Sequence, residues 1–278
     1  MRKLGIGLLL ACSAACSFFN SALYGASDQA GRNVGASVVG GAGAPQGGQQ
    51  NAAGYGGPQG GQTVAYGGGG GNMSMATMNP AFLNMYMGVI FSYAFSSGGY
   101  DVSQVEYKSG QYTRWNGKGQ NGKAVIVERA HLTDDAQGRQ WWKVKFTDDQ
   151  NRTTILEGLL DPAQKKFVRM RAKFPDDKEG NEMAMSDQNY YQPPQKLTPE
   201  SIDGATRGVE SVAVPAGSFQ ARHVVFGAMD GAREWWLVSN VPGGAVKQLM
   251  KNPKTDQDRW EMELAAYGND AASELGSK

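Results

Sequence analysis

The sequence predicts a mainly β protein, with a curved antiparallel sheet or half-barrel and one apolar helix, preceded by a disordered Gly-rich segment. Three observations support this fold class. Runs that alternate apolar and polar residues recur between residues 100 and 268, most clearly over residues 260–267. Turn signals such as Asp230-Gly231 separate the runs. Low-complexity glycine and glutamine dominate residues 27–72, where little apolar surface is available for a core.

The N-terminus has the pattern of an export signal over residues 1–15. Arg2 and Lys3 precede an apolar run and then small residues. The sequence around Cys16 resembles a bacterial lipoprotein box, although Ser13 stands where Leu is usual, so we expect lipidation at Cys16. Cys12 is a second candidate, and an ordinary signal peptide with incidental cysteines is the alternative. Ser17, in place of an aspartate, favours the outer membrane. We therefore expect an exported outer membrane lipoprotein, periplasmic or surface-facing, whose first partner is the membrane that holds its anchor.

Residues 16–77 are expected to form a disordered tether. Repeats of Gly, Gln and Pro cannot bury enough apolar surface to offset the entropy of ordering. A Gly-rich coil of roughly 50 residues spans about 35–45 Å on average. Such a tether would keep a folded domain near a membrane and leave it free to move there.

An apolar helix is expected over residues 78–97. Asn79 can cap it and Pro80 suits its first turn, and residues 81–95 are apolar on nearly every face. The helix is short for crossing a bilayer. It either docks on the sheet, inserts in a membrane, or makes a homo-oligomer. The candidate contact residues for a partner or membrane are Phe82, Met85, Tyr86, Phe91 and Phe95.

The β domain is expected over residues 98–268. Its first block has strand patterns at residues 123–130, 140–146, 153–160 and 167–174, and its second at 209–214, 219–226, 233–239 and 260–267. Residues 175–203 form a polar excursion between the blocks, in which Thr198-Pro199 could open a short helix. The small, polar residues 269–278 are expected to be a disordered tail.

Tryptophan pairs supply the candidates for a ligand groove. A Trp-Trp pair in a strand places one indole on each face, so one of each pair leaves the main core. Such an indole covers an edge, lies under the apolar helix, or lines a groove. The groove candidates are Trp141, Trp142, Trp235, Trp236 and Met170.

No motif in the sequence points to catalysis, a cofactor or a metal. Gly-x-Ser-x-Gly, the phosphate-binding glycine loop and His-Glu-x-x-His are all missing. His131 and His223 are expected to be hydrogen-bonded structural residues. The formal net charge of +1 gives no support for nucleic-acid binding. With both cysteines in the first 16 residues, a disulfide scaffold and a thiol nucleophile in the β domain are excluded.

Residues 210–219, the Trp235-Trp236 strand and residues 241–247 carry a family resemblance. The chain resembles uncharacterised exported bacterial lipoproteins that are broadly similar to LolA/LolB-like periplasmic half-barrel proteins. The resemblance covers about residues 100–268. It implies a strongly curved antiparallel sheet, in some members half-closed around a hydrophobic cavity that a helix can plug, and it implies no catalytic residues.

These observations predict a non-enzymatic cell-envelope lipoprotein. We expect it to bind an apolar or lipid-like ligand, or an envelope partner, through the concave face of the β domain. The alternative is a structural scaffold that oligomerises or inserts in a membrane through the helix at residues 81–95.

Overall fold

The computed structural model describes residues 90, 91, 94, 95, 100–118, 123–185, 191, 193–228, 231–251 and 260–278. All of them belong to one unit, Ser74–Lys278. The expected signal peptide, the tether and the lipidation candidates Cys12 and Cys16 lie outside the described residues, as do Phe82, Met85 and Tyr86.

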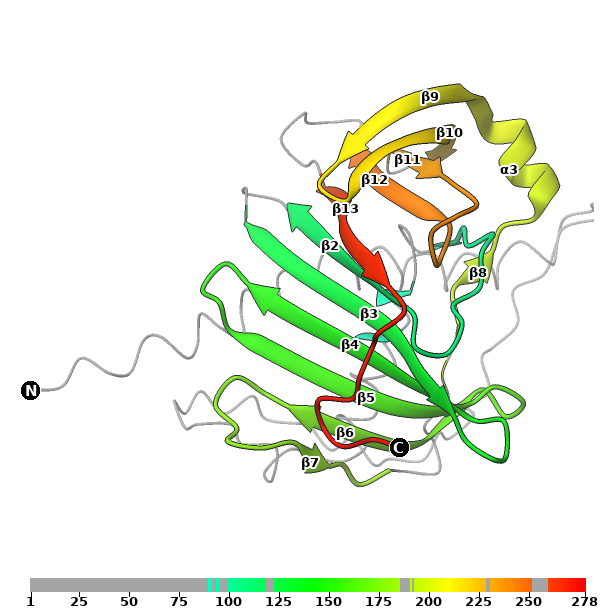
Figure 1. Ribbon diagram of the computed structural model, residues 1–278. Coiled ribbons are helices and arrows are strands. Elements are labelled where there is room, and N and C mark those ends of the chain that lie inside the picture. Colours follow the sequence, from blue (N-terminus) through cyan, green and yellow to red (C-terminus); the bar gives the residue numbers. More distant parts are fainter. Residues whose placement is uncertain are drawn as a thin grey trace, which may run out of the picture. The chain divides into compact units, whose positions relative to one another are not determined.

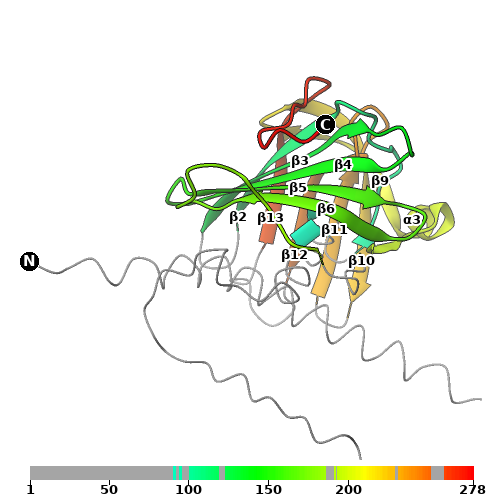
Figure 2. The same ribbon diagram turned by 90° about the horizontal axis from the view of Figure 1, so that it is seen from below.

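The predicted fold class is confirmed: the described residues form a curved, open, 11-stranded sheet whose neighbouring strands are all antiparallel (Figures 1 and 2). The strands are β2 (Tyr112–Lys118), β3 (Ala124–Asp134), β4 (Gln140–Asp148), β5 (Thr153–Asp161), β6 (Lys166–Lys173), β7 (Asn181–Glu182), β9 (Thr206–Val214), β10 (Gly217–Ala228), β11 (Gly231–Leu237), β12 (Ala245–Lys251) and β13 (Trp260–Gly268). Their order is β7-β6-β5-β4-β3-β2-β13-β12-β11-β10-β9. Every neighbouring pair is consecutive in the chain except β2 and β13. The last strand of this sheet therefore lies beside its first strand.

Two further short elements accompany the sheet. β1 (Tyr100–Asp101) and β8 (Gln195–Lys196) pair in parallel as a small second sheet. The short helix expected after Thr198 is present as α3 (Pro199–Ala205), and the Thr198 side chain accepts a hydrogen bond from the Ser201 N–H. Ile202 fixes α3 to the core because its side chain is fully buried.

Three strands that the sequence pattern did not predict complete the sheet, and one of them, the two-residue β7, lies in the expected polar excursion. β2 carries Asn116-Gly117, which resembles a turn, yet Gly117 is required by close packing: a Cβ there would lie 2.6 Å from Met262 Sδ. β12 follows Pro242-Gly243-Gly244 and buries residues without strict alternation. The second block therefore contains five strands rather than the four expected.

The cross-strand register defines two faces. Trp142 pairs with His131, Val127 with Trp115, and Trp115 with Leu264. Opposed residues share a face and alternate residues along a strand do too, so these side chains lie on one face, here called the inner face. Trp141 and Lys143 project from the other, outer face.

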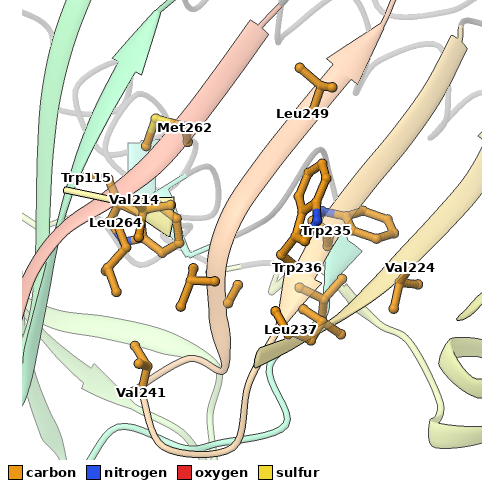
Figure 3. Close-up of a cluster of buried hydrophobic side chains, with 14 of the residues drawn as sticks. Trp115, Val214, Val224, Trp235, Trp236, Leu237, Val241, Leu249, Met262 and Leu264 are labelled. Carbon is orange, nitrogen blue, oxygen red and sulfur yellow. The ribbon is translucent and has the colours of Figure 1, made fainter. Parts of the chain in front are cut away.

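The largest part of the core forms on the inner face. Figure 3 shows its side chains arriving from neighbouring strands, among them Trp115, Trp235, Met262 and Leu264. The sheet curls until the turn between β9 and β10 reaches β13, where Ala216 N donates to the Leu264 carbonyl at 3.0 Å. That turn is Pro215-Ala216.

The C-terminal segment is ordered, contrary to the expectation of a disordered tail. Residues 269–278 cross the outer face over β3–β6 (Figure 1). Glu157, fully buried on β5, accepts hydrogen bonds from Glu274 N at 2.7 Å, Leu275 N at 3.2 Å and Ser273 Oγ at 2.7 Å. The Trp141 indole donates to the Lys278 carbonyl at 3.0 Å. Small, polar composition misleads here because a buried carboxylate supplies the acceptors that the tail's backbone needs.

The end of the predicted apolar helix packs on the inner face. Ile90, Phe91 and Ala94 are helical and buried, and Phe95 N donates to the Phe91 carbonyl at 3.1 Å. Within the described residues, no helix has the length and apolar character needed to cross a bilayer.

Candidate functional site

A cavity of about 330 Å³ lies on the inner face, beneath Phe91 and Phe95 and beside the segment 101–107. Its lining combines aromatic rings with a few polar side chains. The lining residues are Phe91, Phe95, Asp101, Val102, Ser103, Val105, Glu106, Tyr107, Arg129, Gln140, Trp142, Leu160, Phe167, Tyr191, Pro193, Pro194, Gly243 and Ala245. A mostly apolar pocket with a few polar groups is the usual form of a small-molecule site.

Three aromatic rings form one wall. The Trp142 centroid lies 4.9 Å from that of Phe95 and 5.8 Å from that of Tyr107, both in edge-to-face geometry. Phe95 and Tyr107 are themselves 6.0 Å apart and nearly perpendicular. These pairs connect three separate parts of the chain, and each such contact contributes roughly 0.5–1.5 kcal/mol beyond area burial.

Trp142 is held in place from behind by His131. The two rings stack with centroids 4.5 Å apart and an interplanar angle of 17°. His131 Nε2 lies 2.9 Å from Asp134 Oδ1, and Nδ1 lies 3.3 Å from the Tyr107 carbonyl oxygen. Both ring nitrogens are thus engaged, which fits a supporting role for this histidine.

Phe91 and Phe167 meet over Gly158 of β5. Their ring centroids are 4.7 Å apart. A Cβ on Gly158 would lie 2.8 Å from the Phe167 ring and 3.3 Å from Phe91 Cζ. The glycine therefore provides the space in which the apolar segment docks.

The polar lining is unevenly placed. Arg129 is buried, with 7% of its surface exposed, whereas Glu106 is exposed to solvent. Asp101 accepts hydrogen bonds from the Ser103 N–H at 2.8 Å and from the Ser103 hydroxyl. Burial, and then the charge of Asp101, raise the pKa of Tyr191, so its phenol stays neutral. Arg129 is thus the fully buried charge of the described lining, and Asp101 is a half-buried charge of opposite sign.

Of the ligand-groove candidates, the cavity uses Trp142 alone. Trp141 lies on the outer face below the C-terminal segment. Trp235 and Met170 are on the inner face, but both are buried within packed side chains away from the cavity. Among the helix candidates, Phe91 and Phe95 line the cavity rather than facing outward.

Trp236 lies on the outer face in a polar setting. It stacks on His223 with centroids 4.5 Å apart and an angle of 8°. Its indole donates to Glu210 Oε1 at 2.6 Å, and Lys247 Nζ lies 5.8 Å from its ring centroid. His223 Nε2 is 3.0 Å from Glu234 Oε2, so this histidine is hydrogen-bonded as well.

Sequence reasoning missed several cavity residues, including Arg129, Tyr107, Phe167 and Tyr191. Arg129 follows Glu128 in its strand, and nothing in the pattern distinguishes it. Tyr107 and Tyr191 lie in irregular segments, where periodicity has no meaning. Among the described residues, no group of three or more His, Cys, Asp or Glu side chains is arranged to hold a metal ion.

No family model matches the chain, and no curated protein matches it. Some solved structures are similar in part. MucB in the MucA/MucB complex of Pseudomonas aeruginosa has 14% identity and a TM-score of 0.37, with 59% of this chain and 52% of that chain covered. MucB in a separate crystal structure has 13% identity and a TM-score of 0.38, over 63% of this chain and 60% of that one.

A putative exported protein of Bacteroides fragilis with a YmcC-like fold has 11% identity and a TM-score of 0.31, over 60% of this chain and 99% of that one. The present chain thus spans about half the length of the MucB chain in the complex.

Proposed function

We propose that the protein is a non-enzymatic cell-envelope lipoprotein that binds an apolar, lipid-like ligand in the cavity on the inner face of its sheet. The observation that carries this proposal is the aromatic wall of Phe95, Tyr107 and Trp142 around a space of about 330 Å³. When a ligand covers apolar surface that faces a cavity, the free energy of the system falls by roughly 25 cal/mol per Å².

A binding role fits the polar groups better than catalysis does. The cavity is lined by Asp101, Glu106 and Arg129, and Asp101 already accepts two hydrogen bonds from Ser103. The nearest imidazole, that of His131, is engaged at both nitrogens. In the described lining the Ser103 hydroxyl donates to Asp101 two residues earlier, a local side-chain contact that is typical of a loop rather than of a nucleophile with its general base.

Export and lipid anchoring are supported by the N-terminal sequence. Arg2, Lys3 and the apolar run to Ala15 precede Cys16, the proposed lipidated residue. A lipid anchor would place the cavity near a membrane, where lipid-like ligands are abundant. Intact-mass analysis of the protein from a bacterial host tests this: a Cys16→Ala variant should lose the acyl mass, whereas Cys12→Ala should keep it.

The scaffold alternative makes a different demand on the apolar segment. Ile90 and Phe91 are each 1% exposed and Ala94 is 6% exposed, so these side chains are buried within the subunit and are not available for contact with a second copy. An oligomer would have to use other residues of the segment. Native mass spectrometry over a hundredfold concentration range separates the two, because a scaffold predicts a mass that grows with concentration.

The direct test of ligand binding uses the full mature chain. Organic extraction of the purified protein, followed by mass spectrometry, should release a lipid of defined mass in near-stoichiometric amount. Titration with the apolar dye N-phenyl-1-naphthylamine should give saturable fluorescence. Absence of both an extracted lipid and saturable dye binding would overturn the proposal.

A further inference from the structure

Arg129 is a buried cation in the cavity whose described partners are all uncharged. Its Nη1 donates to the Ala94 carbonyl at 2.6 Å, and its Nε donates to Thr113 Oγ1 at 3.4 Å. The guanidinium carbon lies 4.9 Å from the Trp115 ring centroid. No carboxylate among the described residues forms an ion pair with it.

Lys143, on the outer face of the neighbouring strand β4, shows how the fold accommodates another buried cation. Its ammonium lies 2.9 Å from Glu128 Oε1 and 3.0 Å from Glu274 Oε1. Two carboxylates thus balance one buried charge there, while Arg129 has a carbonyl, a hydroxyl and an indole face.

A buried guanidinium without an opposite charge beside it destabilises the folded state. Arginine stays protonated under all ordinary conditions, so the charge cannot be removed by loss of a proton. Desolvating such an ion is strongly unfavourable. A cation–π contact and a carbonyl at a helix C-terminus each offset only part of that cost. An anion entering the cavity would supply the missing opposite charge.

The donor geometry leaves room for that anion. The bonds to described residues engage Nε and Nη1, and Nη2 takes part in none of them. Two carboxylates also line the cavity, but neither forms an ion pair with Arg129: Asp101 is half-buried and already accepts two hydrogen bonds from Ser103, and Glu106 is exposed, so its charge is screened by solvent. The apolar wall at Trp142 and Phe95 belongs to the same cavity.

We infer that the cavity binds an amphiphile with a single anionic head group, carboxylate or phosphate, held by Arg129, and with its hydrocarbon chain against Trp142 and Phe95. This inference rests on the proposed ligand-binding function and adds the chemical class of the ligand. A volume of about 330 Å³ is at the small end of the range of roughly 300–1,000 Å³ for ligand sites. A single chain of medium length therefore fits better than a lipid with two long chains.

The test compares decanoate, decyl phosphate and 1-decanol as competitors of N-phenyl-1-naphthylamine on the full mature chain at pH 7.5. The three share one chain and differ in the head group. We expect decanoate, decyl phosphate or both to bind at least tenfold more tightly than decanol. Preference for only one anion would identify the head group as carboxylate or phosphate.

Variants then assign the preference to Arg129. Arg129→Met should bring the anions to the affinity of decanol, and Arg129→Lys should retain part of the difference. Arg114→Met is the matched control, because Arg114 pairs with Glu128 at 2.8 Å on the outer face and should leave the preference intact. If Arg129→Met does not fold, the wild-type ratio of anion to alcohol still decides.

The outcomes separate the two proposals. Equal affinity of the wild type for decanoate, decyl phosphate and decanol would overturn the anionic inference and leave the apolar binding function standing. A wild type that binds neither the dye nor any of the three competitors would overturn both.

Discussion

His131 stacks on Trp142 across the β3–β4 pair with ring centroids 4.5 Å apart, and this contact fixes the indole that walls the cavity. The same pairing recurs between His223 and Trp236 across β10–β11, also at 4.5 Å. The two pairs have one local geometry but lie on opposite faces of the sheet. They therefore provide an internal control, since only the first pair borders the cavity.

Trp142→Ala is expected to weaken binding of N-phenyl-1-naphthylamine by tenfold or more, because it removes an aromatic wall of the cavity. Trp236→Ala should leave dye affinity within about twofold. Both variants should lose stability, by roughly 2–4 kcal/mol, as deletion of a packed tryptophan side chain generally does. Dye titration and urea unfolding measure the two effects separately. Equal loss of dye affinity in both variants would show that the dye reports stability rather than the cavity.

Gly158→Ala is expected to dislodge the apolar segment. The added methyl would meet the Phe167 ring at 2.8 Å, and overpacking of this kind costs about 1–3 kcal/mol. Hydrogen exchange at residues 90–95 should accelerate more than exchange in β9–β13. Gly227→Ala is the matched control, because a Cβ there meets nothing within 4 Å, and it should be neutral or slightly stabilising. Unchanged exchange at residues 90–95 in Gly158→Ala would contradict the docking role of this glycine.

Glu157→Leu is expected to release the C-terminal segment. The change leaves the N–H groups of Glu274 and Leu275 without their acceptor, at a cost of about 2–3 kcal/mol. Amides of residues 271–278 should then exchange at nearly the rate of an unfolded peptide. Glu179→Leu, at an exposed position, should change stability by less than about 0.5 kcal/mol. A tail that remains protected in Glu157→Leu would refute this account of its docking.

Acid should destabilise the protein partly through the cluster around Lys143. Burial raises the pKa of Glu128 and of Glu274, but hydrogen bonds from Lys143, together with Arg114 at Glu128 and Lys145 at Glu274, outweigh it, and both pKa values are lowered. A carboxyl whose folded pKa is depressed contributes stability above its unfolded pKa and loses it as the pH falls through the folded value.

The free energy of unfolding should therefore decrease as the pH is lowered beyond about 4.5, where glutamates of the unfolded chain titrate. Lys143→Met should make this acid dependence shallower. It should also cost near the low end of the roughly 3–5 kcal/mol typical of a broken buried pair, because Arg114 still contacts Glu128. Urea unfolding between pH 3 and 7 tests this. An acid dependence as steep in Lys143→Met as in the wild type would exclude the cluster as its source.

Much of the sheet could be predicted from the sequence. Strands with one wet face, such as β6 and β13, show their period-2 pattern directly. β12 was not predicted because it is buried on both sides, so its residues do not alternate. β2 was not predicted because Asn116-Gly117 is typical of a turn, while the glycine is needed for close contact with Met262 and Val125.

The site could be predicted only in part, for reasons that lie in three dimensions. That one indole of a Trp pair leaves the core follows from strand geometry, and Trp142 does so. Which pair borders a cavity depends on what covers each face, and the covering residues are Phe91, Phe95 and residues 101–107 on one face and residues 271–278 on the other. The C-terminal segment covers Trp141. Contacts with Glu157 and Lys143 hold the segment there, and both of these residues lie more than a hundred residues earlier in the chain.

The placement of β13 beside β2 also bears on how the chain reaches this structure. Within the 11-stranded sheet all other neighbours are consecutive strands, so each can form as a local hairpin. The pairing of β13 with β2, here called the seam, runs from Tyr112–Gly268 to Lys118–Glu261. It joins strands that are separated in sequence by most of the domain, so its formation carries a loop-closure entropy cost that local pairs avoid. We expect two meanders, β2–β7 and β9–β13, to form first and the seam to join them late. A chain divided between β7 and β8 would then yield two fragments able to recombine along that seam.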